Sequence, residues 1–201
     1  MPKISDEQRR VNETRFVDAA RRCFTRHGVE STSMEQIRSE ADVSSGLMYR
    51  YFPSKDALIH AAIAGSMLQF DALISQVTSE SAATSPAGYL EELLTAAARF
   101  RRHTDGVDLF VLAVQGWAYA QTRPTAKALV AEGAERQLAL YRAAAALDSD
   151  DVARAVAGAL AGFIVQSTFT QTEIDVHAYC AALGELGRSP AESTVDPACP
   201  S

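Results

Sequence analysis

Apolar residues along this chain recur at intervals of three and four positions, the spacing that gathers them on one face of an α-helix. In the first such segment five side chains share a face, which predicts a helix from about Asp6 to His27 that ends at Gly28. Strictly alternating β-branched runs, which would indicate strands, are missing, and alanine is abundant. The pattern therefore predicts an all-α fold.

Two short helices are expected after the first. Ser33 fits the N-cap of a helix that runs to about Ala41, with Gln36 three residues on as the return partner of a capping box. Ser44 is placed to cap a third helix, which Pro53 ends because a proline disfavours the α conformation in the residue before it. This third helix has barely two turns.

Capping residues, prolines and apolar stripes predict six more helices, which makes about nine in all. Their expected ranges are 54–80, 86–103, 105–122, 124–147, 150–170 and 175–186, with Gly187 ending the last. The segment from residue 188 onward contains three prolines and is expected to be disordered.

Two short helices joined by a tight turn and buttressed by a longer helix make a helix-turn-helix, whose second helix enters the major groove of DNA. Here that helix carries Tyr49 and Tyr51, which lie two positions apart and cannot share a face, while Leu47, Met48 and Phe52 are available to pack inward. We expect Tyr49 to meet thymine methyl groups or base edges and Tyr51 to meet a phosphate.

The net charge of −6 would ordinarily count against a nucleic-acid partner, but the charge is unevenly distributed. Residues 1–55 hold ten Lys and Arg against eight Asp and Glu, or +2, and the remainder carries −8. This pattern suggests a mildly basic module attached to an acidic body. Chance variation within a charge-rich helix is the alternative, since +2 is a small excess.

Cysteine usage and hydropathy indicate a cytoplasmic protein outside the membrane. The three cysteines are an odd number without C-x-x-C spacing, which argues for a reducing compartment; they are Cys23, Cys180 and Cys199. The N-terminal sequence MPKISDEQRR lacks the apolar stretch of a signal peptide. The most apolar run, residues 155–165, is too short to cross a bilayer.

The segment FTRHGVESTSMEQIRSEADVSSGLMYRYFPSKDALI, Phe24 to Ile59, resembles the TetR family of bacterial transcription regulators. The match combines a glycine after the first helix, Thr-Ser before the second, an A-x-V-S turn, G-x-x-Y-x-Y-F on the third and S-K-x-x-L at the start of the fourth. It covers roughly residues 1–60, while the rest resembles the family only in the number and length of its helices.

The resemblance implies DNA contacts at the start of the second helix, along the third helix and at the start of the fourth. These positions are Ser33, Met34, Glu35, Ser44, Ser45, Gly46, Tyr49, Tyr51 and Lys55. Ser45, Gly46 and Tyr49 are expected to meet base edges. Ser33, Ser44, Tyr51 and Lys55 are expected mostly to position the protein on the DNA backbone.

Two positions depart from the family pattern. Asp42 stands where the family often has glycine, although aspartate also adopts the left-handed turn conformation. Glu35 would either accept a hydrogen bond from a cytosine amino group or stabilise the helix dipole. In place of a DNA contact, Tyr49 could be a core residue and Lys55 a solvated charge. Three arginines are placed either to touch phosphates or to form a solvated face: Arg9, Arg10 and Arg15.

The resemblance further implies a division into a three-helix DNA-binding domain at residues 1–55 and a helical effector-binding and dimerisation domain at 56–187, followed by a tail at 188–201. Candidate pocket residues, for which plain core packing is the alternative, are Phe100, Phe110, Gln115, Trp117, Tyr141, Phe163 and Gln166. Small residues four apart allow either dimer contact or tight internal packing; they are Ala157, Gly158, Ala161 and Gly162.

The expected function is a ligand-responsive DNA-binding regulator, with repression of a palindromic operator as the family default. Its expected partners are double-stranded operator DNA, a small-molecule effector and a second copy of the chain. The alternative is a helical protein-interaction module that does not bind DNA. Because the nucleophile, phosphate-loop, dinucleotide and H-E-x-x-H zinc motifs are missing, we expect no enzyme, no metal site and no cofactor.

Overall fold

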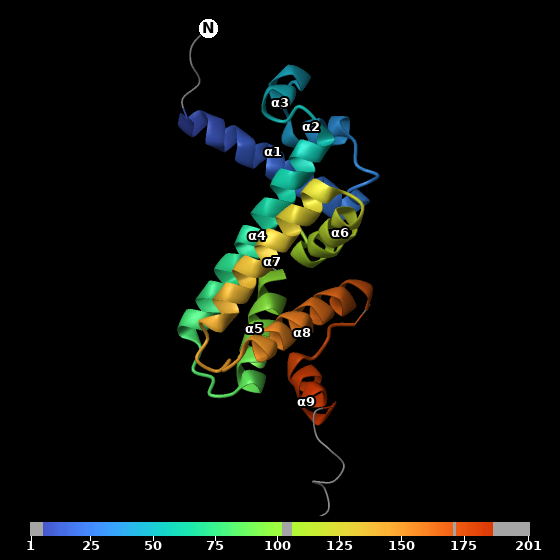
Figure 1. Cartoon of the computed structure of the whole chain (residues 1–201). Helices are drawn as coiled ribbons and strands as arrows, with labels where there is room; N and C mark the ends of the chain where they lie inside the picture. Colours follow the sequence, from blue (N-terminus) through green and yellow to red (C-terminus); the bar gives the residue numbers. More distant parts are fainter. Residues whose placement is uncertain (1–5, 102–105, 171, 187–201) are drawn as a thin grey trace, which may run out of the picture.

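The computed structural model describes residues 6–101, 106–170 and 172–186, and within these ranges every regular element is an α-helix (Figure 1). The elements are α1 Asp6–His27, α2 Met34–Ala41, α3 Ser45–Tyr51, α4 Lys55–Glu80, α5 Pro86–Arg101, α6 Leu109–Gln121, α7 Pro124–Arg142, α8 Asp150–Phe169 and α9 Val176–Leu186. The predicted all-α fold is thus confirmed for the described part of the chain.

Local capping chemistry sets the ends of the first helices where the sequence predicts them. Gly28 follows α1 with a φ of 84°, a left-handed conformation that glycine adopts without a steric penalty. Ser33 and Gln36 form the complete capping box of α2. The Ser54 side chain accepts a hydrogen bond from the backbone N–H of Ala57 and so caps α4.

Other helix ends differ from the prediction. Ser44 occupies the N-cap position of α3 but makes no side-chain capping hydrogen bond. Helix α6 starts at Leu109 rather than 105, because the Asp108 carboxylate accepts from the N–H groups of Phe110 and Val111 and makes Asp108 the cap. The predicted ends at residues 103 and 187, and the predicted disordered tail, fall outside the described residues.

Helix α7 ends at Arg142, although alanine-rich sequence continues the helical pattern to about 147. The Arg142 guanidinium donates to both carboxylate oxygens of Asp150 at the start of α8, at 2.7 and 2.8 Å. The intervening turn also buries Leu147. These contacts with α8 are made where α7 ends earlier than predicted. Tertiary packing there overrides the high helix propensity of alanine.

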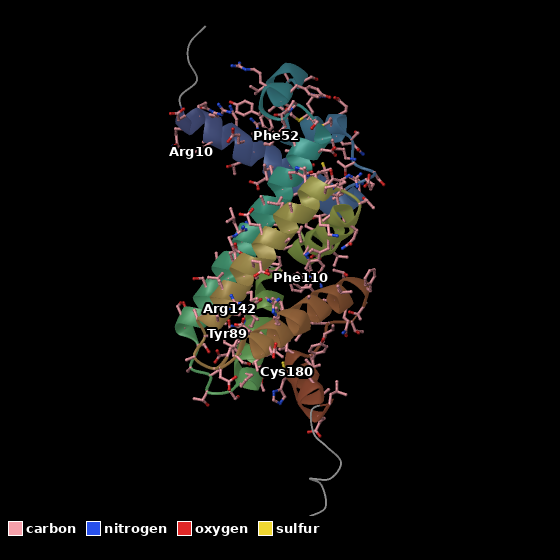
Figure 2. The ribbon with its side chains drawn as sticks, viewed as in Figure 1. Arg10, Phe52, Tyr89, Phe110, Arg142 and Cys180 are labelled. Atoms are coloured by element: carbon pink, nitrogen blue, oxygen red, sulfur yellow. The ribbon has the colours of Figure 1, made fainter. Side chains whose placement is uncertain are left out.

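Helix α4 links the two ends of the molecule (Figure 1). Helices α1 to α3 gather around its N-terminal end, while α7 lies alongside it and α5 packs near its C-terminal end. Helices α8 and α9 cover α5 on the other side of the body. Figure 2 shows Phe52 among the first three helices and Phe110 in the body.

Helices α4 and α8 are long and apolar enough to cross a membrane when judged by length and composition alone. Each also packs against several other helices of the body: α4 against α1, α5, α6 and α7, and α8 against α5, α6 and α7. Core helices of a helical body pass the same composition test, because their buried faces are as apolar as a membrane span. Part of the apolar sequence of each helix is thus buried inside the body.

Candidate functional site

The turn between α2 and α3 is held in a fixed conformation by two arginines. Asp42 adopts the left-handed conformation, with φ 49° and ψ 60°, as expected for its place in the turn. Its carbonyl accepts a hydrogen bond from Arg15 of α1 at 2.9 Å, and the Val43 carbonyl accepts from Arg38 at 2.8 Å. The angle between the two short helices is therefore tied to the first helix.

Helix α3 has one buried face and one exposed face. Met48 is buried, and so is Phe52 just after the helix, while Leu47 is half-buried. Tyr49 points outward with 51% of its surface exposed, and Arg50 beside it is also exposed. Residues Ser44, Ser45 and Gly46 are exposed at the start of the helix. The exposed face thus carries the residues that the sequence assigns to base edges.

Tyr51 lies between α3 and α1. Its ring centroid is 5.3 Å from that of Phe16, and its hydroxyl accepts a hydrogen bond from the Asn12 side chain at 2.9 Å. Because this hydroxyl already accepts a hydrogen bond from Asn12, it would contact a phosphate by donating its own O–H proton. In the free protein Tyr51 therefore holds the short helix on the long one.

Three other predicted contact residues already have partners within the protein. Ser33 is engaged in the capping box of α2, and Met34 is half-buried against the core. Both carboxylate oxygens of Glu35 accept hydrogen bonds from Arg38, which holds the pKa of that carboxyl below its ordinary value. This intrahelical ion pair offsets the negative charge that Glu35 would otherwise bring towards DNA.

Lys55, at the start of α4, donates a hydrogen bond from Nζ to the carbonyl of Glu30 at 2.8 Å. This bond joins α4 to the turn between α1 and α2. The ammonium has two further protons, so a phosphate can still be bound without breaking the bond. Lys55 is half-buried and is therefore more ordered than a freely solvated charge.

Arg50 is a further candidate for contact with DNA, and it is not among the contact residues predicted from the sequence. It is exposed next to Tyr49, and no ion pair of its side chain is found in the described part of the chain. Arg9 and Arg10, in contrast, pair with Glu13 and Glu7 on the surface of α1. An unpaired guanidinium beside an exposed aromatic ring fits phosphate binding better than these paired ones. The position of Arg50 between two tyrosines, Tyr49 and Tyr51, is a sequence signal that could have identified it.

A cavity of about 100 Å³ lies in the body between α4, α6, α7 and α8. Its walls are mostly apolar and comprise Ile63, Ser66, Met67, Phe70, Leu112, Ala113, Gly116, Trp117, Val130, Gln137, Tyr141, Ala157, Leu160, Ala161 and Ile164. Of the candidate pocket residues, Trp117 and Tyr141 line this cavity. Mostly apolar walls with a few polar groups are a feature of small-molecule sites.

The other candidate pocket residues lie elsewhere. Phe110 packs between Phe70 and Phe163, at centroid distances of 6.4 and 6.1 Å, and Phe100 packs on Phe70 at 6.3 Å. Gln166 is exposed and donates to the Tyr179 hydroxyl at 3.3 Å. The three candidate phenylalanines thus form an aromatic row with Phe70, which itself lines the cavity, and Gln166 contacts α9 instead.

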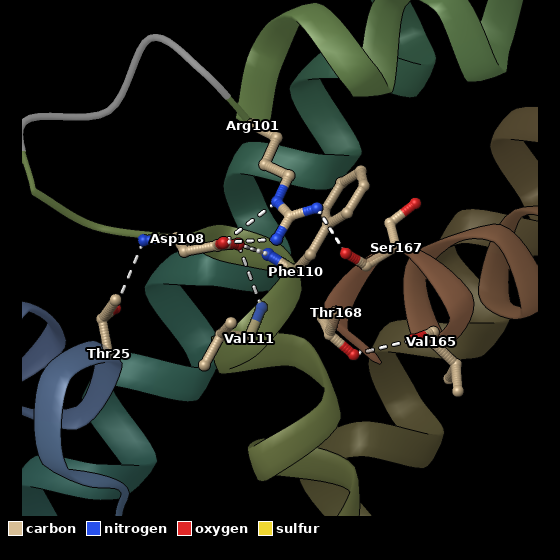
Figure 3. Close-up of polar contacts among 8 residues, drawn as sticks. All are labelled: Thr25, Arg101, Asp108, Phe110, Val111, Val165, Ser167 and Thr168. Atoms are coloured by element: carbon tan, nitrogen blue, oxygen red, sulfur yellow. Dashed lines mark hydrogen bonds and ion pairs between the residues drawn. The ribbon is translucent and has the colours of Figure 1, made fainter. Parts of the chain in front are cut away.

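The aromatic row ends at a polar junction of four helices (Figure 3). The Arg101 guanidinium lies over the Phe110 ring, 5.2 Å from its centroid, and forms hydrogen bonds with the Asp108 carboxylate and the Ser167 carbonyl. The Asp108 backbone N–H donates to the Thr25 hydroxyl of α1 at 3.3 Å. Arg101 and Asp108 thereby join α5, α6 and α8 to the end of α1.

Helix α6 links the cavity to the first three helices. Gln115 accepts a hydrogen bond from the Val29 N–H at 2.8 Å and donates to the Phe24 carbonyl at 3.2 Å. One turn later, the Tyr119 hydroxyl donates to Asp56 at 2.7 Å, and its burial together with this bond raises its pKa to about 12. Arg123, at the end of the helix, pairs with Glu30 at 3.1 Å.

Helices α8 and α9 carry exposed apolar residues at separate positions. Phe169 is 75% exposed and Leu186 is 83% exposed, and Gly158 is exposed with open space where a Cβ would stand. A Cβ on Gly162 would stand 3.6 Å from the Tyr179 hydroxyl. Ala157 and Ala161 face the cavity instead. The four small residues therefore serve two surfaces, with the glycines away from the cavity.

The attachment of α9 is expected to depend on pH through His177. Its imidazole makes a 2.9 Å contact with the Glu91 carboxylate of α5, which raises its pKa above the ordinary 6.5. The stabilisation is fully present below that ordinary value and is lost as the pH rises through the raised one. We expect His177→Ala to lower the melting temperature at pH 5.5 but not at pH 9. Equal destabilisation at both values would contradict this assignment.

Comparison with known proteins places this arrangement among bacterial regulators. The family model described as bacterial regulatory proteins, tetR family, matches residues 16–62. The repressor KstR of Mycobacterium tuberculosis is 33% identical over 70 residues, which is 35% of this chain and 32% of that protein. The chain thus spans about a third of the length of the curated relatives it matches.

Two solved structures resemble nearly the whole chain. A TetR family member, SCO1917 from Streptomyces coelicolor A3, is 26% identical with a TM-score of 0.71, over 87% of this chain and 97% of that one. The multidrug binding protein EbrR, complexed with malachite green, is 26% identical with a TM-score of 0.66, over 87% of this chain and 96% of that one. The similarity therefore extends from the helix-turn-helix into the body.

Proposed function

We propose that this chain, whose residues 16–62 match the tetR family of bacterial regulatory proteins, is a ligand-responsive transcriptional repressor. Residues 1–55 would bind an operator in double-stranded DNA, and residues 56–187 would bind an effector and hold two copies together. The observation that carries the proposal is the exposed face of α3, with Tyr49 projecting from a helix whose opposite face is locked into the core.

A single short helix reads few base pairs, so the proposal requires two copies on half-sites about 34–36 Å apart. The exposed apolar residues of α8 and α9, Phe169 and Leu186, together with the open space at Gly158, are compatible with pairing there. A two-fold axis through this surface would bring the same residues of both copies together. The two α3 helices would then face successive major grooves.

Effector release of DNA would act through α4 and α6. Both helices line the cavity, and both are hydrogen-bonded to the first three helices, through Lys55 and through Gln115. A ligand that enlarges the cavity would favour an arrangement in which α4 is rotated. The two α3 helices would then no longer align with successive major grooves of the DNA. Helix α4 fixed between free and ligand-bound states would count against this coupling.

The primary test measures binding of the full chain to fragments from the upstream region of its own gene. We expect retention of a specific duplex at low ionic strength, with two protomers per site. The logarithm of the binding constant should fall linearly with that of salt concentration, with a slope of about −0.9 for each phosphate contacted. A chain that retains no duplex at low salt would instead be a protein-interaction module.

Tyr49→Ala should separate DNA binding from folding. Because half of the Tyr49 surface is already exposed, the substitution is expected to leave the free energy of unfolding almost unchanged. Operator affinity should fall about tenfold, as expected for loss of an apolar base contact. Leu68→Ala, at a site on α4 that is 61% exposed, is the control and should bind DNA like the wild type.

A further inference from the structure

The cavity between α4, α6, α7 and α8 contains a polar atom without a partner. The Ser66 side chain of α4 lines the cavity with only 5% of its surface exposed. Its hydroxyl makes no hydrogen bond within the described part of the chain. A buried hydroxyl left in this state costs free energy, which a ligand with a matching group would recover.

Two further polar groups line the same cavity. The Tyr141 side chain of α7 is 2% exposed, and its burial raises its pKa, so that the phenol stays neutral near pH 7. Gln137, one helical turn earlier on α7, adds an amide that both donates and accepts. No hydrogen bond of either side chain is found among the described residues. All three groups are therefore available to a ligand.

The lining contains no Asp, Glu, Lys or Arg among the described residues. One acidic group, Asp71, acts on Tyr141 without lining the cavity, and its Oδ2 atom is paired with Arg136 at 3.3 Å. A charged ligand entering this space would lose its hydration without gaining a counter-ion, which is strongly unfavourable. The chemistry of the walls therefore selects against both cations and anions.

We propose that the effector is a small neutral alcohol or phenol, with an apolar body against the aliphatic walls and a hydroxyl held by Ser66, Gln137 and Tyr141. This inference rests on the proposed function and specifies the ligand of the same site. A ligand hydroxyl fits better than a carbonyl, because a hydroxyl can both donate and accept a hydrogen bond. The Gln137 amide oxygen needs a donor, whereas the Gln137 N–H and the hydroxyls of Ser66 and Tyr141 can use an acceptor.

The size of the cavity limits the apolar body to about one ring. An apolar protein cavity of about 150 Å³ binds benzene, and the space here is about 100 Å³, so even one ring requires the walls to move slightly. Met67 lies against Gly133 and lines the wall, and its flexible thioether can move to admit a slightly larger body. Larger ligands would require the helices themselves to separate.

The test uses four probes that share one ring and differ in one group: p-cresol, toluene, 4-methylbenzoate and 4-methylbenzylammonium. Binding to the full chain is measured by titration calorimetry without DNA. We expect p-cresol to bind about three- to tenfold more tightly than toluene, as one neutral hydrogen bond predicts, and the two ions not to bind. Binding of either ion as tight as that of p-cresol, or no binding of p-cresol, would overturn the proposal.

Variants identify the groups that hold the hydroxyl. Ser66→Ala and Tyr141→Phe should each lower p-cresol affinity about three- to tenfold and leave toluene affinity unchanged. Ser75→Ala, at an exposed serine of the same helix, is the matched control and should bind both probes like the wild type. If the cavity variants weaken both probes equally, their effect is structural and the assignment of these residues is wrong.

A parallel measurement of operator binding separates this inference from the proposed function. If p-cresol binds with the expected selectivity but leaves operator affinity unchanged, the ligand class stands and the coupling to DNA fails. If the chain binds its operator but none of the neutral probes, the ligand class fails and the DNA-binding function stands.

Discussion

Replacing Phe16 with alanine is expected to lower the free energy of unfolding by about 3–5 kcal/mol, the usual cost of removing a buried phenylalanine. Phe16 is 0% exposed in α1, and its ring lies 5.3 Å from Tyr51 and 6.2 Å from Phe52. The cavity left by the substitution would lie between α1 and the end of α3. Urea unfolding followed by circular dichroism measures the change.

The same substitution should weaken DNA binding even under conditions in which most molecules remain folded. Tyr51 would keep its hydrogen bond from Asn12 but lose the ring against which it packs. The orientation of α3 would then be less well defined, and ordering it on DNA would cost conformational entropy. Leu68→Ala is the control for stability and should change it by less than about 0.5 kcal/mol. Equal effects of the two substitutions would contradict the assigned role of Phe16.

Gly158→Arg is expected to convert the protein to a monomer and to lower operator affinity about 100-fold, because the two reading helices are then no longer linked. The added side chain has open space in the protomer, and any residue other than proline favours a helix interior over glycine. On a two-fold interface, however, two arginines would meet across the axis. Light scattering gives the oligomeric state, and fluorescence anisotropy gives the affinity.

The matched control is Ala139→Arg, which adds the same charge at an exposed position of α7. It should remain a dimer and retain operator affinity, since α7 contributes none of the exposed residues proposed for the dimer interface. A Gly158→Arg variant that still dimerises would place the interface elsewhere on the protein. Wild-type protein that is monomeric at micromolar concentration and on DNA would reject the dimer altogether.

The first four helices were largely predictable because their ends depend on neighbouring residues. A capping box, a glycine with positive φ and a serine N-cap each act within a few positions of the chain. The exposure of Tyr49 followed in the same way, since Met48 and Phe52 take the buried face of a two-turn helix. The ends of α6 and α7 were predicted less well, because the Arg101–Asp108 and Arg142–Asp150 pairs accompany them.

Helix periodicity and capping are local properties, so the order of residues was enough to predict the helical fold, the place of the helix-turn-helix and its outward aromatic residue. The folded structure was needed to find that Tyr51 holds α3 on α1 and that Gln115 joins α6 to α1. It also separated Trp117 and Tyr141, which line the cavity, from the phenylalanines packed beside it. Each of these roles depends on contacts between segments that are distant in the chain. The spacing of aromatic residues along the chain does not reveal such contacts.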